Sequence, residues 1–464
     1  MQTDWQERNK WIADPAAGFI EATRRIAICR ETRGEALYLG DVKIDRIPPD
    51  ISSLTWLRSL NIYGSPLADL NALAPLVHVE EFMAGSLNSA SPSLDFLKGW
   101  QSLRALTLIA TTPLDLAPLA ACTQLSRLGI SCHRHPVDLI NLETMRDSKA
   151  LHHLSLTNMR SSDFLTVGKW TALSFVQLID TNLDSLDGFE GLEALKHLDV
   201  RSSFVSDLSP LSQLPCLREL KVAKTALSDL APVTHMKSLV ELCAAWTQVT
   251  DVRALAGLGL QSIDLSGCPI IDIGPLSECS NLRHVDLSDT KIPSVRALRD
   301  LRQLRSLAIA RTTVRDLGPL GAFPFLGFFD ARESAIESIT ALATGNAVQA
   351  VNISGTQVDD LKPLRDAKDC RSLNLRGSRV KDLADIVDTG SRRSQDRGDA
   401  REFLDFRDTP ASKLNDRFSE LAFLAEESGE KCFFETKKYL KEREALANRK
   451  RRSSRLFGLF KPPR

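Results

Sequence analysis

The chain contains 464 residues, and its 59 basic and 59 acidic side chains give a formal net charge of zero. A neutral chain has no overall field that would draw it to nucleic acid, so we expect no nucleic-acid partner. Its hydrophobic fraction of 43% and charged fraction of 25% are those of an ordinary soluble protein.

The cysteines and the apolar runs indicate the compartment. Nine cysteines are present, an odd number with no pair at C-x-x-C spacing, which favours reduced thiols over a disulfide framework. The opening segment MQTDWQERNKW has no apolar signal core, and no run of 18 apolar residues occurs. We therefore expect a cytoplasmic protein.

Residues 1–34 are predicted to form an N-terminal helical cap. Asp14 and Pro15 provide an N-cap residue and a proline at the first helical position. Apolar residues then recur near helical spacing as far as Ile26, and Gly34 ends the segment as a C-cap would. A stack of repeats needs such a cap, because its open end would expose apolar core and an unpaired strand edge.

Residues 35–410 are predicted to form one solenoid of stacked repeats. From Leu151 to Cys370 the phrase L-x-x-L-x-[LVI]-x-x-[TS]-x-[VIL]-x-D-L-x-P-L recurs ten times, nine times after 22 residues and once after 21. It is clearest in residues 217–233, LRELKVAKTALSDLAPV, and a fixed period of this length is the signature of a solenoid. The repeats start at Leu57, Val79, Leu103, Leu125, Leu151, Leu173, Leu195, Leu217, Leu239, Leu260, Leu282, Leu304, Leu326, Val348 and Cys370.

Each repeat position has an expected structural use. Leu198 and Val200 alternate with outward residues as a strand does, and parallel strands of successive repeats would form one concave sheet. A hydroxyl residue eight positions after each repeat start, such as Thr225, is expected to bond the backbone of the turn. The Asp of each D-L-x-P-L element, such as Asp229, is expected to cap a short helical turn, so these acids are structural and not catalytic.

Five further segments interrupt or follow the repeats. The insertions SASPS and HRHPVD, after Val79 and Leu125, are expected to bulge from the convex or loop side, and the polar insert 388–400 is expected to be a mobile loop. Residues 411–448 are predicted to form a C-terminal helical cap whose second helix ends near Asn448. Residues 449–464 carry seven basic side chains and no acid, and we expect them to be a disordered tail.

With these repeats the chain resembles the leucine-rich repeat proteins, specifically the 22-residue subclass typified by internalins and by the eukaryotic regulator of protein phosphatase 1. Residues 24–51, RRIAICRETRGEALYLGDVKIDRIPPDI, are similar to the opening of bacterial cytoplasmic repeat proteins. The resemblance implies a leucine-rich-repeat horseshoe with a parallel concave sheet that binds other proteins, and it implies a bacterial origin.

No motif predicts an enzyme or a bound cofactor. Sequences of the form G-x-x-x-x-G-K-[ST], H-E-x-x-H and G-x-S-x-G are all missing. Residues 132–135, CHRH, lie in an irregular insertion without a second ligand pair nearby, so we expect no metal. Some bacterial repeat proteins end in a cysteine-dependent ubiquitin ligase domain, but too little chain follows Cys432 for that activity to be expected.

The outward strand positions and strand ends are the predicted partner-binding site. Exposed aromatic and arginine side chains anchor many interfaces, so Phe175, Trp246 and Phe328 are the expected hot spots. The predicted contact residues are Phe175, Gln177, Ile179, His197, Asp199, Arg201, Glu219, Lys221, Trp246, Asp264, His284, Asp286, Arg311, Phe328, Asp330 and Arg332.

These observations predict a non-enzymatic, monomeric protein-protein interaction scaffold whose concave face binds a protein partner of unknown identity. By analogy with the eukaryotic family member, the alternative is a regulatory subunit of a phosphatase-like enzyme. A third function is a scaffold held at an anionic membrane surface by its basic tail. The membrane contacts would then be Arg449, Lys450, Arg451, Arg452, Phe457 and Phe460.

Overall fold

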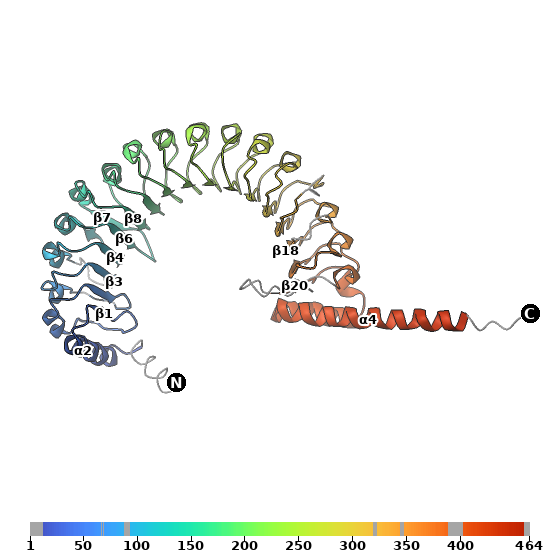
Figure 1. The fold of residues 1–464 in the computed structure, drawn as a ribbon, viewed down its shortest axis with the longest axis horizontal. Coiled ribbons are helices and arrows are strands. Elements are labelled where there is room, and N and C mark those ends of the chain that lie inside the picture. Colours follow the sequence, from blue (N-terminus) through green and yellow to red (C-terminus); the bar gives the residue numbers. More distant parts are fainter. Residues whose placement is uncertain are drawn as a thin grey trace, which may run out of the picture. The chain divides into compact units, whose positions relative to one another are not determined.

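The computed structural model describes residues 13–458, apart from residues 66, 68, 88–92, 319–322, 344–347 and 388–401 and the side chains of 427, 429 and 448–458. The chain divides into two compact units, residues 1–243 and residues 244–464. In both units the described repeats contribute strands to a parallel sheet, and short helices lie on the opposite side of the turns (Figure 1). The predicted α/β solenoid is confirmed.

The first unit begins with α2 (Pro15–Thr32), and the predicted N-terminal cap helix is confirmed. The Asp14 carboxylate accepts hydrogen bonds from the N–H groups of Ala16 and Ala17, as an N-cap does. Gly18 of this helix packs so closely on the following chain that a Cβ would lie 1.9 Å from the Lys43 carbonyl oxygen. Only glycine therefore fits where the helix covers the first turn.

The main sheet of the first unit is parallel, and equivalent repeat positions pair directly, as in Phe175 with His197. Its strands are β1 (Ala36–Tyr38), β2 (Ser59–Ile62), β3 (Glu81–Leu87), β4 (Ala105–Ala110), β6 (Arg127–Ser131), β8 (His153–Thr157), β10 (Phe175–Ile179), β11 (His197–Asp199), β12 (Glu219–Lys221) and β13 (Glu241–Cys243). The short helices are η1 (Pro49–Ser53), η2 (Asn71–Leu73), η3 (Asp95–Gly99), η4 (Ala117–Ala121), η5 (Leu142–Met145), η6 (Phe164–Lys169), η7 (Phe189–Gly191), η8 (Ser209–Leu211) and η9 (Ala231–His235).

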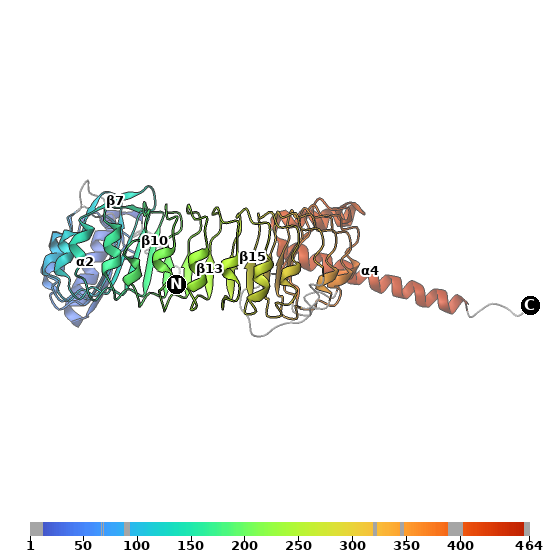
Figure 2. The same cartoon turned by 90° about the horizontal axis from the view of Figure 1, so that it is seen from above.

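The insertion after Leu125 builds a second, smaller sheet. Its strands β5 (Leu114–Asp115), β7 (Val137–Ile140) and β9 (Met159–Arg160) pair in the order β5-β7-β9, and Figure 2 shows β7 at one edge of the unit. We expected a bulge at this insertion and found a paired strand. The insertion SASPS lies almost wholly outside the described residues, as does the insert 388–400.

The second unit continues the same pattern and ends in two helices. Its strands are β14 (Ser262–Asp264), β15 (His284–Asp286), β16 (Ser306–Ala308), β17 (Phe328–Asp330), β18 (Ala350–Asn352), β19 (Ser372–Asn374) and β20 (Phe403–Asp405). Its short helices are η10 (Arg253–Leu255), η11 (Gly274–Glu278), η12 (Arg296–Leu298), η14 (Thr340–Leu342), η15 (Lys362–Leu364), η16 (Ala384–Ile386) and η17 (Ala411–Lys413).

The helices α3 (Asp416–Glu427) and α4 (Gly429–Gly458) follow the last strand, and the predicted C-terminal helices are present. We had expected the second of these helices to end near Asn448, but α4 continues to Gly458. Residues 449–457 contain neither glycine nor proline, so nothing in them stops a helix. No helix in the described part of the chain is long and apolar enough to cross a membrane.

The repeat columns carry the structural roles that their sequence predicts. Leu198, Val200 and Leu220 are fully buried. The column hydroxyls donate to the carbonyl three residues before them at 2.6–3.2 Å, as predicted, in Thr181, Ser203, Thr225, Thr247, Thr290, Thr312, Ser334 and Thr356. The Asp229 carboxylate accepts the N–H of Ala231 at 2.7 Å, so this acid has a structural role at the start of η9, although the N-cap position itself is Leu230.

Candidate protein-binding face

The candidate site is the sheet face, by which we mean the strand side chains that point away from the core in each unit. In the first unit, three aromatic rings are stacked across β8, β10 and β11. The ring centroid of Phe175 lies 4.1 Å from that of His153 and 4.3 Å from that of His197, with interplanar angles of 3° and 4°. The stack arises because in-register parallel strands place equivalent side chains about one strand spacing apart, roughly 4.8 Å.

Charged groups flank both ends of this aromatic stack. The His197 Nδ1 lies 2.8 Å from Glu219 Oε2, whereas its Nε2 is buried and has no hydrogen-bond partner among the described residues. At the other end, burial and then the positive charges of Arg127 and His197 lower the pKa of His153. The stack therefore has His197, which lies beside a carboxylate, at one end and His153, whose neutral form is favoured, at the other.

Three other predicted contact residues of the first unit are partly exposed on the sheet face. Gln177 accepts a hydrogen bond from Ser155 at 3.0 Å and stays half-buried on the face. Lys221 lies 3.1 Å from Glu241, so it sits in a surface ion pair. Ile179 is also half-buried, at the end of β10. These residues remain available to a partner.

Asp199 has a different role from the one we predicted. Its side chain is only 1% exposed, and its carboxylate accepts hydrogen bonds from the backbone N–H of Arg201 at 3.2 Å and from the guanidinium at 2.7 Å. The carboxylate therefore closes the turn after β11 and orients Arg201, which is itself 43% exposed. Asp199 cannot contact a partner directly, and Arg201 can.

The same turn chemistry recurs in the second unit. The carboxylates of Asp264, Asp286 and Asp330 accept the N–H groups two residues further on, at 3.0, 2.9 and 3.0 Å. Asp330 is buried, and we remove it from the predicted contact set, whereas Asp264 and Asp286 are half-buried. An acid or Asn two residues before a turn is the signature of such side-chain-closed turns, and this signal could have identified the column.

The remaining predicted residues of the second unit reach the surface. Phe328 is 44% exposed, His284 is exposed, and Arg332 lies 3.6 Å from Asp330 with a half-exposed side chain. Trp246 is 53% exposed, and the Arg311 guanidinium binds the Asp289 carboxylate through two contacts of 2.5 Å. All five outer positions can meet a partner, although Arg311 and Arg332 are already paired with acids.

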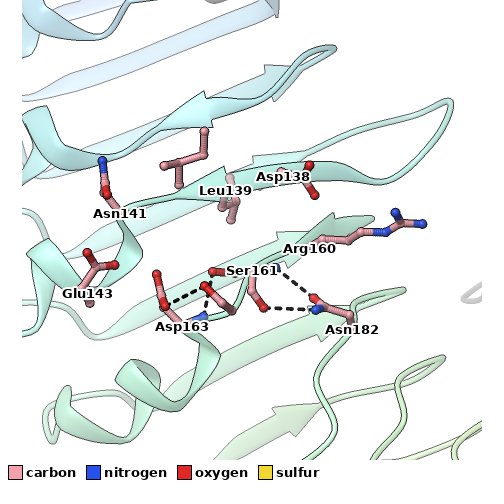
Figure 3. A pocket seen from close by; sticks show the side chains of 10 residues that line it. Asp138, Leu139, Asn141, Glu143, Arg160, Ser161, Asp163 and Asn182 are labelled. Carbon is pink, nitrogen blue, oxygen red and sulfur yellow. Dashed lines mark hydrogen bonds between the residues drawn. The ribbon is translucent and has the colours of Figure 1, made fainter.

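A hollow in the first unit was not predicted from the sequence. It has a volume of about 610 Å³ and lies at the end of the small sheet, where Asn182 accepts the N–H of Ser161 at 2.9 Å and donates to its carbonyl at 3.1 Å (Figure 3). A side-chain hydrogen bond with Asp163 raises the pKa of Glu143. Only the longer spacing of the repeat at Leu125 hinted at an unusual structure here.

The buried thiols are poorly suited to nucleophilic chemistry. All nine cysteines are free, and burial raises the pKa of Cys122 to about 11 and those of Cys370 and Cys432 to about 12. Protonated, buried thiols are poor nucleophiles. Among the described residues no group of three or more His, Cys, Asp or Glu side chains could hold a metal ion.

The predicted membrane-contact residues cannot be placed on a surface. The side chains of Arg449, Lys450, Arg451, Arg452 and Phe457 are outside the described part of α4, and Phe460 lies beyond the described residues. Membrane contact by the tail therefore stays a prediction.

Comparison with solved structures identifies the fold. The chain is similar to a leucine-rich-repeat protein of Leptospira interrogans, with 17% identity and a TM-score of 0.62 over 72% of this chain and 90% of that one. It is similar to the functional domain of InlJ from Listeria monocytogenes, with 17% identity and a TM-score of 0.51 over 74% and 68% of the two chains.

A third similar structure is the leucine-rich-repeat ectodomain of a plant membrane receptor kinase from Arabidopsis thaliana, solved in complex with CASPARIAN STRIP INTEGRITY FACTOR 2. It shares 16% identity and a TM-score of 0.60 over 81% of this chain and 52% of that one. No family model and no curated protein sequence matches the chain. The expected leucine-rich-repeat fold is thus confirmed.

Proposed function

Because the chain has the leucine-rich-repeat fold, we propose that it is a non-enzymatic scaffold that binds a protein partner through its sheet face. The observation that carries this proposal is the stack of His153, Phe175 and His197 on the sheet of the first unit. Leucine-rich-repeat proteins generally mediate contacts between proteins, and the similar plant receptor ectodomain was solved in complex with CASPARIAN STRIP INTEGRITY FACTOR 2.

The aromatic stack lies outside the core. Beneath it the apolar interior is complete, because Leu154, Val176 and Leu198 of the same strands are fully buried. The three rings are half-buried on the sheet face, with His197 12% exposed, in positions fixed by the strand register. Aromatic groups that are held rigidly lose little conformational entropy when a partner binds, which favours affinity.

The sheet face of the first unit is large enough for a protein interface. Its strands from β1 to β13 span roughly 45 Å at about 4.8 Å per strand. A standard interface buries about 800 Å² on each partner, which such a surface accommodates. The paired charges beside the stack, such as Lys221 with Glu241, are typical of the polar rim of an interface.

A photo-cross-linker placed on the face tests this proposal. Benzoylphenylalanine in place of Phe175 keeps an aromatic side chain at the centre of the stack, and the same group in place of Leu165 provides the control. Leu165 is 49% exposed on η6, on the other side of the turn. In an extract of cells that encode the protein, we expect one adduct that forms from position 175 and not from position 165.

The identity of the adduct distinguishes the functional alternatives. A phosphatase catalytic subunit would favour the regulatory-subunit function, and another protein would favour a general scaffold. An adduct that forms from position 165 alone would contradict binding by the sheet face.

A further inference from the structure

Trp246 departs from the chemistry of its column in the second unit. The residues that close the turns there have left-handed backbone conformations, with φ from 54° to 73°, at Trp246, Gly267, Asp289, Arg311, Glu333, Gly355, Gly377 and Asp408. This conformation brings a Cβ too close to the backbone and favours Gly, Asn or Asp. A tryptophan is the bulkiest residue in the column, and its side chain is 53% exposed, so core packing does not explain it.

The neighbouring turn leaves space for the indole. A Cβ built on Gly267 would lie 2.4 Å from Cδ2 and 2.6 Å from Cε3 of Trp246. Any other residue at position 267 would therefore displace the ring. The indole rests against the bare backbone of Gly267 and keeps its remaining surface open to solvent, which makes it a fixed aromatic platform.

Backbone hydrogen bonds connect this platform to two turns that carboxylates close, because Ser266 accepts the N–H of Trp246 and Ser288 accepts the N–H of Gly267 at 2.8 Å. Ser266 accepts the Trp246 N–H through its carbonyl at 2.7 Å and donates its own N–H to Asp264 at 3.0 Å. In the next turn, Ser288 donates its N–H to Asp286 at 2.9 Å. These connections place both acids in the two turns that follow the turn of Trp246 in the stack.

The charge of Asp286 is not balanced by an arginine. Other acids near the strand ends of this unit have one, as in the pairs Asp330–Arg332 and Asp405–Arg407. Asp286 forms no ion pair with a Lys or Arg of the described residues. Burial raises the pKa of Asp286, and repulsion by the charges of Asp264 and Asp330 adds to this shift against the hydrogen bonds from Ser288. A cation brought to this place would relieve that repulsion.

We propose that Trp246, Asp264 and Asp286 form a subsite for a basic side chain, arginine or lysine, of the protein partner. The cation would lie over the open part of the indole, where the ring quadrupole attracts it, and beside the two carboxylates. An acidic side chain would be repelled at the same place. This inference rests on the proposed function and names the partner chemistry that the second unit recognises.

A direct test measures binding of labelled peptides to the full chain by fluorescence anisotropy. The probe is a short peptide with two arginines separated by glycine, and the control probe replaces each arginine by neutral citrulline. We expect the arginine peptide to bind at least tenfold more tightly than the citrulline peptide, and its affinity to fall as salt is added.

Variants of the two acids can be made without disturbing the turns. Asn352 and Asn374 occupy the same column and accept the same backbone N–H, at 3.2 and 3.3 Å, so Asn preserves the turn when it replaces Asp. The double variant Asp264→Asn/Asp286→Asn and the variant Trp246→Gly should each weaken arginine-peptide binding roughly fivefold to tenfold. Glu278→Gln, an exposed charge removal on η11, should leave binding unchanged.

The outcomes separate this inference from the proposed function. Equal binding of the arginine and citrulline peptides, or unchanged binding by both site variants, would overturn the subsite. The cross-link from position 175 reports on the first unit and does not depend on Trp246. An adduct there, together with peptides that do not discriminate, would leave the scaffold function standing and remove the basic-side-chain subsite.

Discussion

The hydroxyl residue that lies eight positions after each repeat start can be replaced by alanine at two comparable positions. At one of them the hydroxyl forms a hydrogen bond, and at the other it does not. Ser334 and Ser378 are 4% and 2% exposed, in repeats of the same unit. The Ser334 hydroxyl donates to the Ala331 carbonyl at 2.6 Å, whereas the Ser378 hydroxyl has no hydrogen-bond partner among the described residues. We predict that replacing each serine by alanine has opposite consequences for stability.

The magnitudes follow from what each alanine removes. Ser334→Ala loses one buried hydrogen bond, whose net contribution to the free energy of unfolding is about 0.5–1.5 kcal/mol. The Ala331 carbonyl keeps a second donor, the Ser334 N–H at 3.1 Å, so no orphan acceptor adds to this loss. Ser378→Ala removes a buried hydroxyl that forms no bond, and an unsatisfied buried group costs about 1–3 kcal/mol. Its stability should therefore stay the same or increase.

Urea unfolding of the full chain, followed by far-ultraviolet circular dichroism, measures both variants against the wild type. We expect the midpoint to fall for Ser334→Ala and to stay or rise for Ser378→Ala, with the same dependence on urea in all three proteins. Equal losses in the two variants would refute the idea that the hydrogen bond, and not the volume of the hydroxyl, is what this column supplies.

Three further predictions concern the ends of the solenoid, its aromatic stack and its thiols. Gly18→Ala should lower the stability of the chain by about 1–3 kcal/mol, because the new Cβ would meet the Lys43 carbonyl, and an unchanged unfolding midpoint would show that α2 can shift. Folding lowers the pKa of His153 below its ordinary value of 6.5, so the stability that neutral His153 contributes is fully present above pH 6.5 and is lost as the pH falls through the folded pKa. In His153→Phe the urea midpoint should therefore depend less on pH in that window. A pH dependence equal to that of the wild type would contradict this. The exposed Cys216 should react with a thiol reagent in the folded protein, whereas Cys432, with a pKa of about 12, should react only on unfolding. Equal labelling rates for the two thiols, measured by mass spectrometry, would disprove the burial of Cys432.

The fold could be predicted because each repeat position has one dominant physical role. Leu220 had to be buried, and Thr247 had to satisfy a buried carbonyl, since the period repeats both requirements through much of the chain. The small sheet could not be predicted in this way. Its strand β7 arises from a single insertion, and its pairing with β5 and β9 depends on contacts that no sequence period encodes.

The candidate face was predicted in outline, and its errors have a common cause. Strand alternation places Asp199 and Asp330 outward, but these residues stand where the strand already bends into its turn. There, the carboxylate is within reach of the N–H two residues on, and it folds back to bind it. Alternation describes a continuing strand and fails at the last residue of a strand only three residues long.

A residue whose type differs from those at the equivalent positions of the other repeats is therefore more informative about function than a residue of the usual type. Many turns close their strand with a residue in the left-handed conformation, and glycine or aspartate does this at little cost. Trp246 closes its turn with a strained backbone and a half-exposed indole, and it also requires glycine at position 267. Stability alone would favour a smaller residue at position 246. Its presence is explained if the indole is needed by something outside the chain, and the negative charge beside it indicates that this is a cation.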